Sequence, residues 1–272
     1  MRKCALERTL STNQIIQHGL PIRKGFWAES QRGEEAAVLV SEQTVPSSPF
    51  NDFFKVFTNE KLPNKVVGVS DNPLLTKKAN IQKSLNLVQG IPTVLVVGGG
   101  DGMGGIVLQA QALGSKLQQC SEARKCKYQM VVVCGKNQVA QETLSAVEWG
   151  QDIHVQVKGF VNNMDEWMKA SDILVTKAGP GTIAEAAICG LPCMLSSFLP
   201  GQEEGNIPFV ENAGFGSYSE TPDEIANTVS TWLASPTLLA EMKENALKAA
   251  RPTATLDIAR DVASILFKSK SM

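Results

Sequence analysis

The sequence predicts an α/β fold in which a parallel sheet carries helices on both faces. Three observations support this prediction. From about residue 85 onward, short apolar runs alternate with segments of helical composition, which is the pattern of strands joined by crossover helices. Two of these apolar runs end in turns rich in glycine. A chain of 272 residues with 43% apolar content is also long enough to bury one or two cores.

The predicted elements follow one another closely along the chain. The strands are the short, mainly apolar runs at residues 93–97, 129–134, 154–158, 173–176, 192–196 and 216–218. The helices are the longer segments at residues 104–119, 138–147, 164–170, 181–189, 206–213, 222–234, 236–250 and 253–267. Because strands and helices alternate at this short spacing, we expect all of the longer strands to be parallel.

Two of the predicted strands run into turns of small residues. Residues 98–105 contain six glycines in eight positions, a cost in backbone entropy that a merely structural turn rarely needs. Residues 177–182 read Lys-Ala-Gly-Pro-Gly-Thr. Bare backbone N–H groups at a helix N-terminus can bind an anion. Two such turns at the carboxyl ends of strands predict one diphosphate between two helix N-termini, with these ligands: Gly99, Gly100, Gly181 and Thr182.

Two common nucleotide-binding motifs fit these turns less well. Gly100, Gly102 and Gly105 fit G-x-G-x-x-G, but that pattern alone is weak evidence for a dinucleotide site, and no acidic residue ends the next strand. No G-K-[ST] follows, so a P-loop is excluded. An ordinary glycine-rich turn with a surface Glu explains residues 177–186 taken alone. The functional interpretation places Glu185 one turn into the helix, where its carboxylate can accept hydrogen bonds from a ribose diol.

Composition excludes several classes of protein. A net charge of −1 and a pI near 6.2 give no electrostatic footprint for nucleic acid. The six cysteines contain no C-x-x-C pair, so we expect reduced thiols, no metal site and no cofactor. No apolar run approaches the length of a membrane-spanning helix, and no signal peptide is visible.

The motifs together resemble the monogalactosyldiacylglycerol synthase family. The resemblance lies in residues 96–104, 155–160, 176–186 and 201–206, and resumes upstream at residues 17–23, Gln-His-Gly-Leu-Pro-Ile-Arg. These enzymes are plastid galactosyltransferases of the GT-B fold, related to the N-acetylglucosaminyltransferase that makes the peptidoglycan lipid precursor. The resemblance implies that the chain is the Rossmann-like, C-terminal donor-binding half of a GT-B fold.

The resemblance also implies a division of the chain. Residues 1–27 are similar to the segment that links the two GT-B domains, and residues 85–272 form the nucleotide-sugar domain. Residues 28–84 are atypical of the family. Prolines and clusters of Asn and Ser interrupt every periodic run there except residues 52–57. We expect this insertion to be partly disordered.

The function implied is transfer of galactose from UDP-galactose to diacylglycerol, with inversion, at the plastid envelope as a peripheral membrane protein. The family's acceptor site and base lie in an N-terminal domain that we expect to be missing, so the catalytic residues stay unknown. His18 and His154 are not expected to replace that base. The alternative is a non-catalytic nucleotide-sugar-binding module or one subunit of a split GT-B enzyme. A nucleotide-sugar epimerase is a weaker third candidate.

The resemblance assigns roles to the remaining site residues. Phe160 and Val161 present backbone groups to uracil, and Phe160 can equally be a core aromatic. Arg23 adds a cation to the diphosphate site or is a solvated surface residue. The loop before the 206–213 helix offers closely spaced hydrogen-bonding groups for a hexose: Gln202, Glu203 and Asn206. The structural alternatives are an N-cap role for Asn206 and an ordinary acidic surface pair for Glu203 and Glu204.

Overall fold

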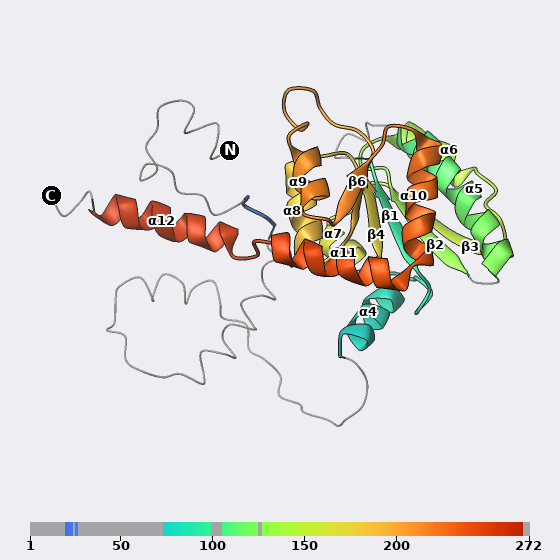
Figure 1. Cartoon of the computed structure of the whole chain (residues 1–272), viewed down its shortest axis with the longest axis horizontal. Helices are drawn as coiled ribbons and strands as arrows, with labels where there is room; N and C mark the ends of the chain where they lie inside the picture. Colours follow the sequence, from blue (N-terminus) through green and yellow to red (C-terminus); the bar gives the residue numbers. More distant parts are fainter. Residues whose placement is uncertain (1–19, 24, 27–72, 99–104, 125–126, 269–272) are drawn as a thin grey trace.

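The computed structural model describes residues 20–23, 25–26, 73–98, 105–124 and 127–268. Its centre is a six-stranded parallel sheet with strand order β3-β2-β1-β4-β5-β6 (Figure 1). All six predicted strands are confirmed, with these bounds: β1 (Thr93–Val97), β2 (Tyr128–Val133), β3 (Ile153–Lys158), β4 (Ile173–Thr176), β5 (Cys193–Leu195) and β6 (Gly216–Tyr218).

The eight predicted helices are also present, within a few residues of their predicted ends. Their bounds, with those of one additional helix, are α4 (Pro73–Ser84), α5 (Ile106–Arg124), α6 (Gln138–Ser145), α7 (Met164–Ala170), α8 (Pro180–Ile188), α9 (Asn206–Asn212), α10 (Pro222–Ala234), α11 (Pro236–Ala249) and α12 (Ala254–Lys268). No helix in the described ranges is both long and apolar enough to cross a bilayer.

Helices cover both faces of the sheet because successive side chains of a strand point to opposite faces. In β1, Val94 and Val96 pack into a core shared with α5, α6 and α10. Leu95 packs into the other core, against α7 and α8. All three of these side chains are at most 1% exposed. The predicted Rossmann-like fold with helices on both faces is therefore confirmed.

The strand order reverses direction between β1 and β4. β1 pairs with β2 on one side and with β4 on the other, both parallel. Val97 and Thr176, the last residues of β1 and β4, are partners in this register. Gly98 and Lys177, which follow these two residues, therefore begin their connections at adjacent strand ends. In open α/β sheets this reversal is where ligands bind.

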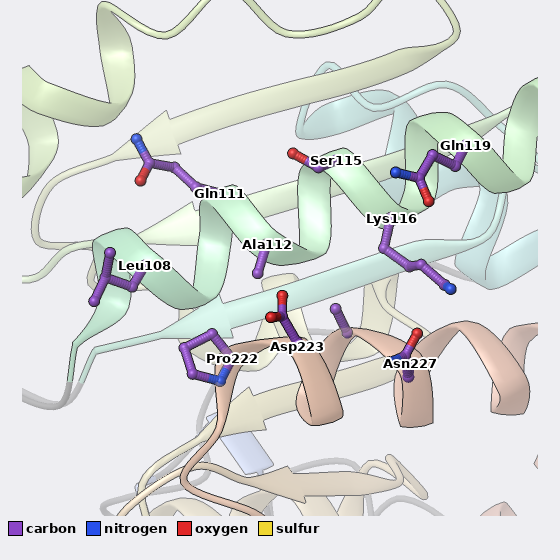
Figure 2. Close-up of a pocket in the computed structure, with 10 residues that line it drawn as sticks. Leu108, Gln111, Ala112, Ser115, Lys116, Gln119, Pro222, Asp223 and Asn227 are labelled. Atoms are coloured by element: carbon purple, nitrogen blue, oxygen red, sulfur yellow. The ribbon is translucent and has the colours of Figure 1, made fainter.

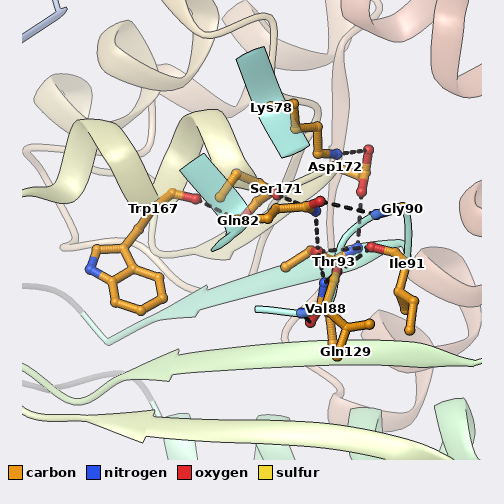
Figure 3. A network of polar contacts seen from close by, with 11 residues as sticks. Lys78, Gln82, Val88, Gly90, Ile91, Thr93, Gln129, Trp167, Ser171 and Asp172 are labelled. Atoms are coloured by element: carbon orange, nitrogen blue, oxygen red, sulfur yellow. Dashed lines mark hydrogen bonds and ion pairs between the residues drawn. The ribbon is translucent and has the colours of Figure 1, made fainter. Parts of the chain in front are cut away.

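Helix α4 was not predicted from the sequence, which placed residues 73–84 in the insertion. The helix packs near α7, and a polar network joins it to the amino ends of the strands (Figure 3). Lys78 Nζ lies 2.5 Å from Asp172 Oδ1, and Asp172 Oδ2 accepts the Thr93 amide at 2.9 Å. Burial lowers the pKa of Lys78, against the opposing effect of Asp172.

Gln82 and Gln129 complete this network. The Gln82 side chain, 1% exposed, donates to Ala170 O at 3.1 Å and accepts the Gly90 amide at 3.2 Å. Gln129 is fully buried and donates to Thr93 Oγ1 at 2.8 Å and to Val88 O at 2.8 Å (Figure 3). Because these buried amides find partners, the network fixes α4 against the sheet.

The short segment at residues 20–26 also packs on this domain. Ile22 and Phe26 are 8% and 4% exposed and belong to the core on the α7–α8 face. The Ile22 amide donates to Thr255 Oγ1 in α12 at 2.9 Å. This contact holds the neighbouring Arg23 over the carboxyl edge of the sheet.

Candidate functional site

The β4–α8 turn presents free amides at the point where the strand order reverses. Gly179 is the N-cap of α8 and has no side-chain cap, and the first intrahelical bond is donated by Ile183 to Gly179 O. The amides of Gly181 and Thr182 precede that bond, so no turn of the helix satisfies them. Gly181 faces open space, since a Cβ added there would meet no atom within 4 Å. Gly99 and Gly100, the other predicted diphosphate ligands, lie outside the described residues.

A cavity of about 130 Å³ opens beside this turn. Four predicted site residues line it, from three separate parts of the chain: Arg23, Phe160, Val161 and Thr182. Val97 and Val133, at the carboxyl ends of β1 and β2, form its floor. Phe160 is 63% exposed, so its interpretation as a core aromatic is wrong. Binding sites for whole small molecules usually measure about 300–1,000 Å³, so this cavity is smaller than a site for a whole small molecule.

Arg23, which lines this cavity, forms an ion pair with Glu185. Arg23 Nε lies 2.6 Å from Glu185 Oε1 and Arg23 Nη2 lies 2.5 Å from Glu185 Oε2, a bidentate arrangement. The carboxylate side chain is 7% exposed and the guanidinium side chain 54%. The hydrogen bond with Glu185 raises the pKa of Arg23, against the opposing effect of burial. Arg23 is therefore an exposed residue whose guanidinium is engaged by Glu185.

The loop at residues 199–206 is fastened to the β4–α8 turn. Glu203 is 7% exposed and forms an ion pair with Lys177, while its second oxygen accepts the Leu199 amide at 2.9 Å. Asn206 Nδ2 donates to Ala178 O at 2.8 Å. Gln202 is exposed. The structure thus brings the predicted sugar-binding loop next to the predicted diphosphate turn.

Two structural alternatives for this loop are corrected. The N-cap of α9 is Gly205, and Asn206 is the first helical residue, so Asn206 does not cap the helix. Glu203 and Glu204 do not form an ordinary acidic surface pair, because Glu203 is buried and paired whereas Glu204 is exposed. The contact with Lys177 explains why the two neighbours differ in burial.

Lys177 is a charged residue at the carboxyl edge of the sheet that was not predicted as a site residue from the sequence. It is the first residue after β4, inside the motif that carried the prediction, and its side chain is 34% exposed. Its position directly after a strand, at the edge of the sheet where binding was predicted, is the sequence signal that could have identified Lys177 as a site residue. Next to it, Thr176 Oγ1 is buried with no hydrogen-bond partner among the described residues.

His154 lies away from this site. It is the second residue of β3, near the amino end of the strand, and pairs in register with Gln129. Its Nε2 lies 3.3 Å from Gln156 Nε2. His18 falls outside the described residues. Within the described part of the chain, no histidine reaches the cavity at the carboxyl edge.

A second, larger hollow of about 650 Å³ lies between α5 and α10 (Figure 2). Its walls carry mostly polar side chains, among them Gln111, Ser115, Lys116, Asp223 and Asn227. None of the predicted site residues contributes to it. Four of the predicted site residues line the smaller cavity instead.

Comparison with known proteins gives one family and a group of plant relatives. Residues 93–257 match the glycosyltransferase family 28 C-terminal domain. The chain is 43% identical over 189 residues to monogalactosyldiacylglycerol synthase 3, chloroplastic, of Arabidopsis thaliana, covering 69% of this chain and 40% of that protein. It is 43% identical over 203 residues to the chloroplastic enzyme of Spinacia oleracea, covering 73% of this chain and 38% of that protein. The chain thus spans about two fifths of the length of these relatives.

Solved structures with a similar fold include the MurG protein of Acinetobacter baumannii. The TM-score is 0.52 at 21% identity, covering 80% of this chain and 64% of that one. WaaG, a glycosyltransferase involved in lipopolysaccharide biosynthesis, gives a TM-score of 0.50 at 18% identity, covering 66% of this chain and 50% of that one. At this level of identity the likeness concerns the fold, which is the GT-B architecture predicted from the sequence.

Proposed function

Because the chain belongs to glycosyltransferase family 28 through its C-terminal domain, we propose that it binds UDP-galactose and takes part in galactose transfer to diacylglycerol. The observation that carries this proposal is the reversal of strand order between β1 and β4. There the register sets the carboxyl ends of β1 and β4 side by side, next to a cavity lined by Arg23, Phe160, Val161 and Thr182. Plant relatives named monogalactosyldiacylglycerol synthase support the choice of sugar and acceptor.

We assign the donor to this edge in three parts. The uracil lies against Phe160 and Val161, and its ribose diol is bound by Glu185. The diphosphate lies between the turn containing Gly99 and Gly100 and the amides of Gly181 and Thr182, where two helix N-termini favour negative charge. The hexose lies toward the loop at residues 199–206.

Among the three residues predicted to bind the hexose, Gln202 is exposed, whereas Glu203 is buried and Asn206 is partly buried. Glu203 and Asn206 bind to the β4–α8 turn through Lys177 and Ala178. We therefore propose that Gln202 contacts the sugar hydroxyls directly, while Glu203 and Asn206 hold the loop at the distance that the hexose needs.

The transfer step breaks the bond between the galactose anomeric carbon and the UDP oxygen. UDP leaves with the electron pair, and the free hydroxyl oxygen of diacylglycerol bonds to the opposite face of that carbon, which inverts it. The hydroxyl proton goes to a general base, a role that we assign to no residue of the described part of the chain. The amides and Arg23 stabilise the charge that develops on the diphosphate, so this chain contributes positioning and electrostatic stabilisation.

A second candidate is a nucleotide-sugar-binding subunit that needs a separate partner for catalysis. The position of His154 favours it, because this residue lies near the amino end of β3 and away from the site. In both cases we place the protein at the plastid envelope as a peripheral protein, on the strength of relatives named chloroplastic.

Calorimetry and a transfer assay test the proposal together. We expect the full chain to bind UDP-galactose and UDP, and to bind ADP much more weakly because Phe160 and Val161 read the uracil edge. Transfer of radiolabelled galactose to diacylglycerol by the chain alone would support the first candidate, an enzyme that is active by itself. Binding of UDP-galactose without transfer would support the second candidate, a subunit that needs a partner. A folded chain that binds neither uridine nucleotide contradicts both candidates.

A further inference from the structure

We propose that the Arg23–Glu185 ion pair occupies the donor site and is exchanged for ligand only when one molecule offers both a diphosphate and a ribose diol. This inference rests on the proposed function, because it takes UDP as the molecule that makes both contacts. The inference concerns selectivity. Because of the ion pair, the site binds a nucleoside diphosphate more tightly than it binds either the nucleoside or pyrophosphate alone.

Arg23 engages both oxygens of the carboxylate that we assign to the ribose diol, at 2.6 and 2.5 Å. The Glu185 side chain is also only 7% exposed, so little of the carboxylate remains accessible. We infer that a ribose binding to both oxygens displaces the guanidinium. Because Arg23 and Thr182 line the same cavity, the displaced guanidinium remains beside the proposed diphosphate position.

The burial of Glu185 makes a partial exchange unfavourable. The residue is only 5% exposed, and a buried carboxylate that loses its partner is left with an uncompensated charge. Pyrophosphate alone can attract Arg23 but offers Glu185 nothing in return. Uridine alone offers Glu185 a diol but leaves Arg23 without an anion. UDP satisfies both groups at once, so its two halves bind with positive coupling.

No other described carboxylate replaces Glu185 as the partner of Arg23. The other carboxylate whose charge raises the pKa of Arg23 is Asp165, and Asp165 pairs with Lys169 at 3.2 Å. Arg23 is held near its place by the buried neighbour Ile22 and by Phe26, whose ring lies 5.4 Å from the guanidinium carbon. The guanidinium therefore has two positions available, on Glu185 or on the ligand.

The test is a double-mutant cycle on the full chain, with pyrophosphate, uridine and UDP as calorimetric ligands. Glu185→Gln frees Arg23 and should bind pyrophosphate about fivefold more tightly, the lower end of what a charge-assisted contact contributes when one partner is half exposed. Arg23→Gln frees Glu185 and should bind uridine more tightly. Both variants should bind UDP more weakly than the wild type, because each lacks one of the two contacts.

The double-mutant cycle distinguishes two causes of tighter pyrophosphate binding by Glu185→Gln, namely release of Arg23 and removal of a negative charge near the ligand. In the Arg23→Gln background, adding Glu185→Gln should leave pyrophosphate affinity unchanged. Glu244→Gln is the control, since Glu244 pairs with Lys248 on α11 at 2.7 Å and both side chains are about two-thirds exposed. It should not alter affinity for any of the three ligands. Thermal melting establishes that each variant is folded, and Glu185→Ala is the second variant if Glu185→Gln does not fold.

Two results overturn the exchange while leaving UDP binding in place. One is a Glu185→Gln protein that binds pyrophosphate no more tightly than the wild type. The other is a gain that persists without Arg23. A wild-type chain that is folded and does not bind UDP instead removes the proposed function on which the exchange rests.

Discussion

Gly181 tests the diphosphate site at the scale of a single residue. A side chain here meets open space within the protein, so its effect falls on whatever approaches the helix N-terminus. We predict that Gly181→Val weakens UDP binding about tenfold, the equivalent of one charge-assisted hydrogen bond, with little change in melting temperature. Calorimetry measures the affinity and thermal melting measures the stability.

The control is Gly205→Val, which also places a valine in open space at a helix start. It lies in the loop assigned to the hexose, and UDP has no hexose, so UDP affinity should stay at the wild-type value. If Gly181→Val is folded and binds UDP like the wild type, backbone amides of this turn do not bind the phosphates.

At the scale of elements, the Lys177–Glu203 pair joins the β4–α8 turn to the loop before α9. We predict that Lys177→Met lowers the free energy of unfolding by about 1–2 kcal/mol, less than for a fully buried pair because Lys177 is 34% exposed. Urea unfolding measures the change. Lys248→Met is the control, because the Lys248–Glu244 pair is 66% and 67% exposed and should show no measurable effect. Equal behaviour of the two variants would mean that the loop is not held by Glu203.

Helix α4 gives a second test at this scale. Gln82→Leu keeps the size of the side chain but leaves the Gly90 amide and Ala170 O without a partner. We predict a loss of about 1–3 kcal/mol in the free energy of unfolding, the cost of leaving one buried group unsatisfied. The cost falls on the carbonyl of buried Ala170, because Gly90 is exposed and its amide can bind water. Gln119→Leu, on the exposed side of α5, should change stability by less than about 0.5 kcal/mol. Matching losses in the two variants would contradict the network in Figure 3.

The elements differed in how well the sequence predicted them, for physical reasons. The strands were predicted because each is a short apolar run ending at a turn. Helix α4 was missed because Pro73 was interpreted as a break, although proline is well tolerated in the first turn of a helix and α4 begins at Pro73. Among its described residues, Ile81 packs against the core, and the polar side chains of Lys78 and Gln82 bind to neighbouring elements. One apolar contact gives no helical periodicity that would indicate a packed helix.

At the scale of the whole molecule, the sheet collects residues that are distant in sequence. Arg23 and Glu185 are separated by 162 positions, yet they form an ion pair. Local turn chemistry predicted Glu185 as a site residue, whereas Arg23 was predicted through the family resemblance. The sequence did not predict that they pair with each other, or that Lys177 pairs with Glu203, since such contacts depend on the tertiary packing of separate elements.

The most direct test of the donor site is the affinity of UDP for the wild type and for Glu185→Ala, measured by calorimetry on the full chain. A carboxylate bonded to both ribose hydroxyls contributes about 1.5–3 kcal/mol, so we predict a ten- to hundredfold loss of affinity on substitution. The protein should remain folded in thermal melting. Equal affinity of UDP for the wild type and for folded Glu185→Ala would contradict the assignment of the ribose, and with it the placement of the donor at the reversal between β1 and β4.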